Sequence, residues 1–257
     1  MTIRSQLGGL RRQVLCSMHQ RALPIGRQGP VVSFCFDDFP RTASTVGGSI
    51  LRSFGVRGTY YAALGLMNTS NHLGDQMRLT DIDSVLSDGH ELGCHTFSHS
   101  SSRSVSADVF ENDVLHGRDA IRELTGCGAD NFAYPFGHVR LNLKKRLGAQ
   151  MSSCRGIYGG INEPAADLNL LRANSLYGDI GQFDSAERLL TENRTRRGWL
   201  IFYTHDVRQD ASPFGCTPGL LEMVVSRTME MGLRIATTGE VVESMQRMGK
   251  HKVSPSK

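Results

Sequence analysis

The sequence has 257 residues, of which 39% are hydrophobic and 21% are charged. A chain of this size and composition can bury the core of one large α/β domain or two small ones, which excludes a disordered or fibrous protein. The net charge of +4 is too small to predict nucleic-acid binding. Basic clusters such as Lys144-Lys145-Arg146 are interpreted as solvated helix faces, with attraction to an anionic substrate or an acidic membrane surface as the alternative.

The sequence carries no recognisable membrane or export signal. It contains no apolar run near the ~18 residues that a membrane span requires. The first 26 residues lack the continuous apolar core of a signal peptide, because Arg11, Arg12 and Gln13 interrupt it. The six cysteines are widely spread without a C-x-x-C pair, which favours reduced thiols over a disulfide framework. We therefore expect a cytoplasmic protein without a transmembrane segment, either free in solution or peripheral at the membrane.

Strands and helices are expected to alternate from residue 31 onward. The apolar run VVSFCF predicts a strand over 31–36, and it is followed by a helix over 42–54 and a strand over 58–62. Thr80-x-x-Asp83 resembles a capping box that opens the next helix. A strand is expected over 90–95.

The second half continues the same pattern. A helix is predicted over 106–124, ending at Gly126, and a further helix begins at Thr217-Pro218 and ends at Gly232. The remaining expected strands are 131–134, 151–155, 170–176, 198–203 and 233–236.

These elements make about seven or eight strand–helix units without a repeat or a linker. They predict one α/β domain, a distorted (β/α) barrel, over residues 28–249. Residues 1–27 are interpreted as a partly helical N-terminal extension, and residues 250–257 as a flexible basic tail.

Polar side chains follow several of the expected strands. They are Asp37 and Asp38 after the first strand, His95 and His99 after the third, and His205 after the run WLIFYT. Each group alone is often incidental. Together, however, one aspartate and two histidines can form a facial metal site with open positions. One aspartate and one histidine are then left over as the two proton-transfer groups that hydrolysis needs.

The same segments resemble the polysaccharide deacetylases, also known as the NodB-homology domain or carbohydrate esterase family 4. The family's T-F-D-D-G motif is similar to SFCFDDFP, and its H-[ST]-x-x-H motif matches His95-Thr96-Phe97-Ser98-His99. Its R-x-P-[YF] motif corresponds to Ala133-Tyr134-Pro135-Phe136, and its L-x-H motif to FYTHD around His205. The order and spacing agree from about Val31 to Glu243.

The resemblance implies a NodB-like barrel and a role for each motif residue. Asp38, His95 and His99 would hold a divalent metal, commonly zinc in this family. Asp37 would be the general base and His205 the acid that protonates the leaving amine. The segment Tyr134-Pro135-Phe136 would contact substrate, with the Phe136 N–H binding the oxyanion.

The sequence departs from the family motifs at three places. Phe39 replaces the glycine after the paired aspartates, so we expect a differently walled pocket. Ala133 replaces the arginine that orients the base in the family. Arg172 is predicted to take over that role, with an outward-facing side chain as the alternative and Arg155 as the next candidate. The family's D-x-x-D-W motif is not recognisable, and LLRANSLYGD occupies its place.

The resemblance implies the metal-dependent hydrolysis of an N-acetyl, or similar N-acyl, group on a sugar. We expect a lipid- or nucleotide-linked precursor of a bacterial surface polysaccharide, such as O-antigen, as the substrate. The alternatives are a non-catalytic sugar-binding domain and a deformylase-type amidohydrolase. A non-haem iron oxygenase is disfavoured, because such enzymes use β-rich scaffolds.

Overall fold

The computed structural model describes residues 13–26 and 29–251. Residues 13–17 are helical and lie within the segment interpreted from the sequence as an N-terminal extension. The expected tail at 250–257 lies outside the described residues from 252 onward. Its first two residues belong to the last helix, α8 (Thr238–His251), so the expected boundary at residue 249 falls inside this helix. No helix in the described part of the chain is both long and apolar enough to span a membrane.

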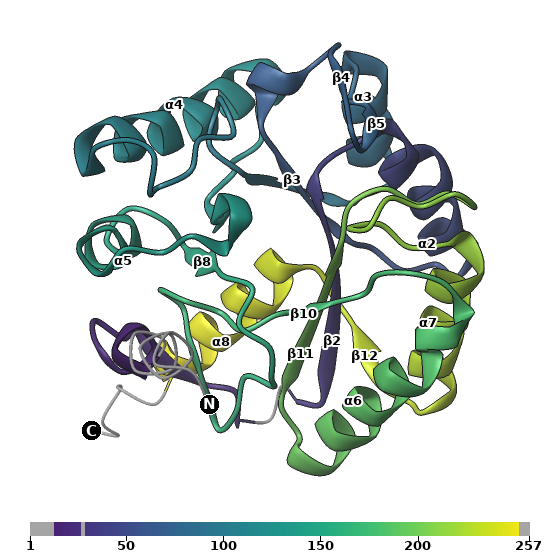
Figure 1. Ribbon diagram of the computed structural model, residues 1–257. Helices are drawn as coiled ribbons and strands as arrows, with labels where there is room; N and C mark the ends of the chain where they lie inside the picture. Colours follow the sequence, from purple (N-terminus) through teal and green to yellow (C-terminus); the bar gives the residue numbers. More distant parts are fainter. Residues whose placement is uncertain (1–12, 27–28, 252–257) are drawn as a thin grey trace, which may run out of the picture.

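A curled sheet of parallel strands forms the centre of the molecule (Figure 1). Its strand order is β10 (Asn174–Ser175), β11 (Trp199–Thr204), β2 (Val31–Asp38), β3 (Thr59–Ala62), β6 (Glu91–Cys94), β7 (Asn131–Ala133) and β8 (Ser153–Arg155), with β12 (Arg234–Ile235) beside the start of β2. Two small antiparallel ribbons pair β1 (Ala22–Pro24) with β9 (Ala165–Asp167) and β4 (Ser70–Asn71) with β5 (Gly74–Asp75). The distorted parallel barrel expected from the sequence is confirmed.

The segment 168–176 connects the two ends of this sheet. Leu171 forms a parallel bridge with Arg155 of β8, and Leu176 N donates to Tyr203 O of β11. The predicted strand over 170–176 is therefore only partly regular, because just Asn174 and Ser175 pair as a strand.

Helices cover the outer face of the sheet. They are α2 (Ser49–Ser53), α3 (Leu79–Ser87), α4 (Ala107–Thr125), α5 (Leu141–Gly148), α6 (Phe183–Arg196) and α7 (Pro218–Glu230), with a π-helix at Ala43–Gly48 and 3₁₀ turns at Leu64–Leu66, Pro135–Gly137 and Ile180–Gln182. The helix start expected at Thr217 and the helix end expected at Gly126 are confirmed, and Ser106 is the N-cap of α4. The capping box expected at Thr80 is wrong, because the N-cap of α3 is Arg78, two residues earlier, and Asp81 accepts a hydrogen bond from Arg78 N.

The alternation of residues along β2 separates two hydrophobic cores. Val32, Phe34 and Phe36 pack beneath the outer helices. Val31 and Cys35 point to the opposite, inner face, where α8 and the β1–β9 ribbon fill the curl of the sheet. Because side chains alternate with period two, Asp37 also points inward, at the carboxyl end of the strand. This parity places the carboxylate at the mouth of the barrel rather than under a helix.

Candidate metal and catalytic site

A cavity of about 250 Å³ opens at the carboxyl ends of the parallel strands. Parallel strands direct their carboxyl ends to one rim, so loops that are distant in the sequence meet there. The cavity is lined by Asp37, Asp38, His72, Leu73, His95, His99, Tyr134, Phe136, Gly137, Ile157, Tyr177, Tyr203, His205 and Phe214. All five residues expected to handle metal or protons are among them.

Asp38, His95 and His99 meet at one point of this cavity. Their potential ligand atoms lie within 4.8 Å of one another. The Nε2 atoms of His95 and His99 lie 3.1 and 2.9 Å from the same oxygen, Oδ1 of Asp38. Burial disfavours ionisation of Asp38, but the contacts with the two histidines outweigh it and hold its pKa well below the usual range.

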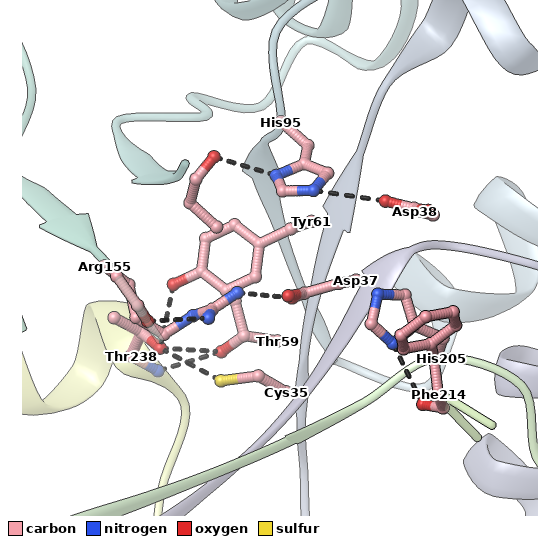
Figure 2. A network of polar contacts seen from close by, with 12 residues as sticks. Cys35, Asp37, Asp38, Thr59, Tyr61, His95, Arg155, His205, Phe214 and Thr238 are labelled. Carbon is pink, nitrogen blue, oxygen red and sulfur yellow. Dashed lines mark hydrogen bonds and ion pairs between the residues drawn. The ribbon is translucent and has the colours of Figure 1, made fainter. Parts of the chain in front are cut away.

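The polar contacts of this cluster fit a bound cation. Nδ1 of His95 lies 2.8 Å from Ala133 O (Figure 2), and because a carbonyl can only accept, this nitrogen carries the hydrogen. In the neutral ring, Nε2 then presents a lone pair toward Asp38. Oδ1 of Asp38 is buried, and apart from the two Nε2 atoms that face it, it has no hydrogen-bond partner among the described residues. Lone pairs on nitrogen and oxygen that converge on one point are the donor set of a divalent metal.

The backbone around this cluster is strained. Asp38, Phe39, Thr96, His99 and Phe136 all have a positive φ between 55° and 63°. Such conformations are unfavourable for residues other than glycine and gather at functional sites. Because the strained residues flank the cavity, the surrounding fold must hold the loop ends in place.

Arg155 pairs with Asp37 on the inner face of the barrel (Figure 2). Asp37 is only 4% exposed, and Nη2 of Arg155 donates to its Oδ1. The guanidinium carbon lies 4.8 Å from the ring centre of Tyr61 and 5.1 Å from that of Tyr203. Burial disfavours the charged guanidinium, yet the neighbouring Asp37 keeps the pKa of Arg155 above its usual value. The pair is therefore a buried contact between a guanidinium and a carboxyl group, shielded from water.

The prediction that Arg172 orients Asp37 is wrong. Leu171 and Ala173 both belong to the inner core, so the intervening Arg172 points outward, and its Nη1 donates to Gly159 O at 3.2 Å. Arg155, the second candidate, makes the contact. Its signal in the sequence was a charged residue at the end of an expected strand.

His205 is held at the cavity by a backbone carbonyl. Its Nδ1 lies 3.0 Å from Phe214 O and therefore carries the hydrogen (Figure 2). Nε2 is then the nitrogen free to face the cavity. The Tyr177 ring centre lies 6.0 Å from that of His205. Neither Tyr177 nor His72 was singled out as a site residue from the sequence, because neither belongs to a motif.

The segment Tyr134-Pro135-Phe136 borders the cavity in two ways. Tyr134 lines the cavity, and its ring is buried against Phe132, with ring centres 4.8 Å apart. Pro135 is also buried, whereas Phe136 is 54% exposed with its ring centre 4.7 Å from that of His99. The oxyanion role of the Phe136 N–H stays a prediction. The expected effect of Phe39 on the pocket wall is wrong, because this ring is fully buried against Tyr60.

The sequence matches the model of the polysaccharide deacetylase family over residues 26–152. No curated protein matches the sequence.

Several solved structures share the fold. The Xyl-CE4 domain of a multidomain xylanase from the hindgut metagenome of Trinervitermes trinervoides is 19% identical, with a TM-score of 0.59 over 88% of this chain and 92% of that one. The peptidoglycan deacetylase PdaC from Bacillus subtilis, as a D285S mutant, is 14% identical, with a TM-score of 0.56 over 88% and 96%. The chitin deacetylase from Colletotrichum lindemuthianum is 19% identical, with a TM-score of 0.55 over 86% and 89%.

Proposed function

The chain belongs to the polysaccharide deacetylase family, and on this premise we propose that it hydrolyses an N-acetyl group on a sugar. Deacetylases of this family generally depend on a divalent metal. One observation carries the proposal. Within one cavity, the Asp38–His95–His99 cluster lies beside a separate carboxylate, Asp37, and a separate imidazole, His205.

Asp38, His95 and His99 would hold zinc. One carboxylate oxygen and two imidazole nitrogens are ligands that zinc accepts, and three protein ligands leave positions open for catalysis. When bound, the ion supplies Lewis acidity that polarises the acyl carbonyl and lowers the pKa of water toward ~7. The hydrogen bond from His95 to Ala133 O fixes the tautomer that ligation needs.

The remaining residues divide the proton transfers. Asp37 accepts a proton from the attacking water, and Arg155 holds this carboxylate in one rotamer by donating to its Oδ1. His205 donates a proton from Nε2 to the departing nitrogen, because an unprotonated amine is a poor leaving group. The N–H of Phe136 binds the developing oxyanion, a contact worth roughly 3–4 kcal/mol in comparable sites.

The cavity mouth suits a sugar ring. The exposed side chains of Phe136, Ile157 and Phe214 surround it and offer apolar surfaces against which a pyranose face can stack. The free thiols of all six cysteines are compatible with a reducing, cytoplasmic location. A lipid- or nucleotide-linked precursor of bacterial surface polysaccharide, such as O-antigen, stays our prediction for the substrate. Glycan analysis of a deletion strain tests it.

The activity is tested on the purified protein, stripped of metal and reloaded with zinc. We expect acetate release from N-acetylhexosamine oligomers, at a higher kcat/KM than from acetylated xylan. Asp37→Asn and His205→Ala should each lower kcat by about 10²-fold or more while zinc stoichiometry stays at one. Asp38→Ala should lose zinc itself. Sugar binding without acetate release would instead show a non-catalytic domain, and release of formate only from N-formyl sugars would show a deformylase.

A further inference from the structure

We propose that Asp206 and Ser212 are positioning residues that hold His205 in the orientation needed to protonate the leaving amine. They act through the main-chain carbonyl of Phe214. The inference rests on the proposed role of His205 and adds residues to which the motifs assign no role. It starts from a carboxylate that the proposed mechanism does not use, although it directly follows His205 in the sequence.

Asp206 is fully buried and closes the loop 206–216 onto itself. Its Oδ2 accepts hydrogen bonds from Ser212 N and Arg208 Nε, both at 2.9 Å. Its Oδ1 accepts from the Ser212 hydroxyl. Cys216 N donates to the Asp206 carbonyl oxygen at 2.9 Å, which joins the two ends of the loop. The carboxylate thereby fixes Ser212 through both the main chain and the side chain.

Hydrogen bonds connect Ser212 to His205 through the main chain of Phe214. Its hydroxyl oxygen accepts from Phe214 N at 3.2 Å. The Phe214 carbonyl oxygen in turn accepts from His205 N at 3.2 Å and from His205 Nδ1 at 3.0 Å. With Nδ1 held in this way, Nε2 faces the cavity. A displaced Phe214 carbonyl would let the ring rotate or change tautomer, and the donated proton would no longer point at the amine.

Gly215 shows how tightly the loop closes around Asp206. A Cβ added at this position would lie 2.4 Å from Asp206 Oδ1 and 2.5 Å from its main-chain oxygen. No side chain fits there without moving the carboxylate. The loop is thus built around Asp206, and not around the exposed Asp210 four residues later.

Substrates with different leaving groups can distinguish a positioning role of Asp206 and Ser212 from a merely structural one. An amine must be protonated as the C–N bond breaks, whereas 4-nitrophenolate leaves an acetate ester without a proton. Damage to the fold or to the metal site slows both reactions. Misorientation of His205 slows only the amide reaction.

The test compares kcat for an N-acetylhexosamine oligomer and for 4-nitrophenyl acetate, using zinc-loaded enzyme. Asp206→Asn places an NH₂ group among donors and should lower amide turnover about 10–100-fold, with ester turnover within about twofold. Ser212→Ala should show the same selectivity, and the double variant should lose less than the product of the two effects. Asp210→Asn is the matched control and should leave both reactions unchanged.

The outcomes distinguish this inference from the proposed function. If His205→Ala slows the amide selectively but Asp206→Asn and Ser212→Ala slow both substrates equally, or neither, the positioning role is wrong. If His205→Ala itself slows both equally, the acid role of His205 fails.

A spectroscopic measurement covers the case in which Asp206→Asn does not fold. In ¹⁵N NMR spectra of zinc-loaded protein, assigned with His205→Ala, neutral His205 should be protonated on Nδ1. Ser212→Ala should shift the ring toward the Nε2-protonated tautomer. An unchanged Nδ1-protonated ring in Ser212→Ala would overturn the inference.

Discussion

Arg155, which contacts the proposed base Asp37, lies on β8. The arginine expected from the motif would lie at position 133 on the neighbouring strand, β7. Ala133 on β7 and Arg155 on β8 are register partners, and neighbouring strands lie about 4.8 Å apart. A methyl group at residue 133 therefore leaves space for the guanidinium to cross toward Asp37. Residue 133 carries no arginine, but Arg155 places a buried cation at the same level of the barrel.

Exchanging the two residues tests this explanation. Arg155→Ala should lower kcat by about 10²-fold, because Asp37 loses both its charge partner and its fixed rotamer. Adding Ala133→Arg to this variant should recover part of the loss in the deacetylase assay. Arg172→Ala is the control and should keep activity within about twofold. An equal loss from Arg172→Ala would contradict the assignment.

Phe39 is a second position at which this sequence departs from the resembled motif, with phenylalanine in place of glycine. Its φ of 58° is a conformation that favours glycine, since a side chain costs about 1–2 kcal/mol there. The buried ring, whose centre lies 5.0 Å from that of Tyr60, offsets this cost. The sequence showed the missing glycine but not which way the ring points, because that depends on packing.

Phe39→Gly should therefore destabilise the protein despite relieving strain. We expect the free energy of unfolding to fall by about 2–4 kcal/mol in urea titrations, since losing a buried aromatic side chain costs about 3–5 kcal/mol. Phe136 has a similar φ of 59° but an exposed ring, so Phe136→Gly should change stability by less than about 1 kcal/mol. A larger loss of stability from Phe136→Gly would contradict the explanation that ring burial offsets the backbone strain at Phe39.

Helix α4 acts as a support for the proposed metal ligands. A Cβ on Gly117, in the middle of this helix, would lie 2.5 Å from Thr96 C and 2.7 Å from Phe97 N. Those two residues lie between His95 and His99. The glycine lets the helix approach the loop closely enough to hold its strained backbone.

Gly117→Ala should weaken zinc binding, although alanine is normally better than glycine inside a helix by about 1 kcal/mol. We expect about a tenfold rise in the zinc Kd, measured by competition with a chelating dye. Gly219→Ala in α7 is the control, because its Cβ would make only an ordinary contact at 3.5 Å. If both variants bind zinc like the wild type, α4 does not position the ligands.

Local sequence patterns predicted the helices and strands more accurately than they predicted the contacts between them. The apolar run of β2 and the caps of α4 and α7 follow from local rules, so these elements were found within one or two residues. The π-helix at Ala43–Gly48 inside the expected 42–54 helix was not foreseen. Arg172 was misplaced for a similar reason, since which side of 168–176 faces inward is set by pairing with β8 and β11.

At the scale of the whole molecule, the N-terminal segment is anchored rather than peripheral. Lys144 of α5 is fully buried, and its Nζ donates to Leu15 O and Met18 O, both at 2.7 Å. The same atom lies 2.7 Å from Oδ2 of Asp167, the last residue of β9, which pairs with β1 in the ribbon. One ammonium group thus ties the helical turn at 13–17 and the ribbon to the barrel.

Lys144→Met should release this segment. Removing the cation leaves a carboxylate and two carbonyls without their partner, so we expect a loss of about 3 kcal/mol in the free energy of unfolding. Trypsin should also cleave after Arg21 much faster than in the wild type. Lys145→Met removes an exposed charge from the same helix and should change neither measurement.

The pairing of β2 with β11 has a consequence for the order of events during synthesis. Val31 pairs with Trp199, which emerges from the ribosome about 170 residues later. At typical elongation rates of ~5–20 residues per second, the apolar edge of β2 waits roughly 10–30 s for its partner. Such long-range parallel pairing makes folding slow and leaves the nascent chain prone to aggregation. The part of the chain that matches the family model, residues 26–152, therefore lacks the β11 partner of β2 until residues 199–204 have been synthesised.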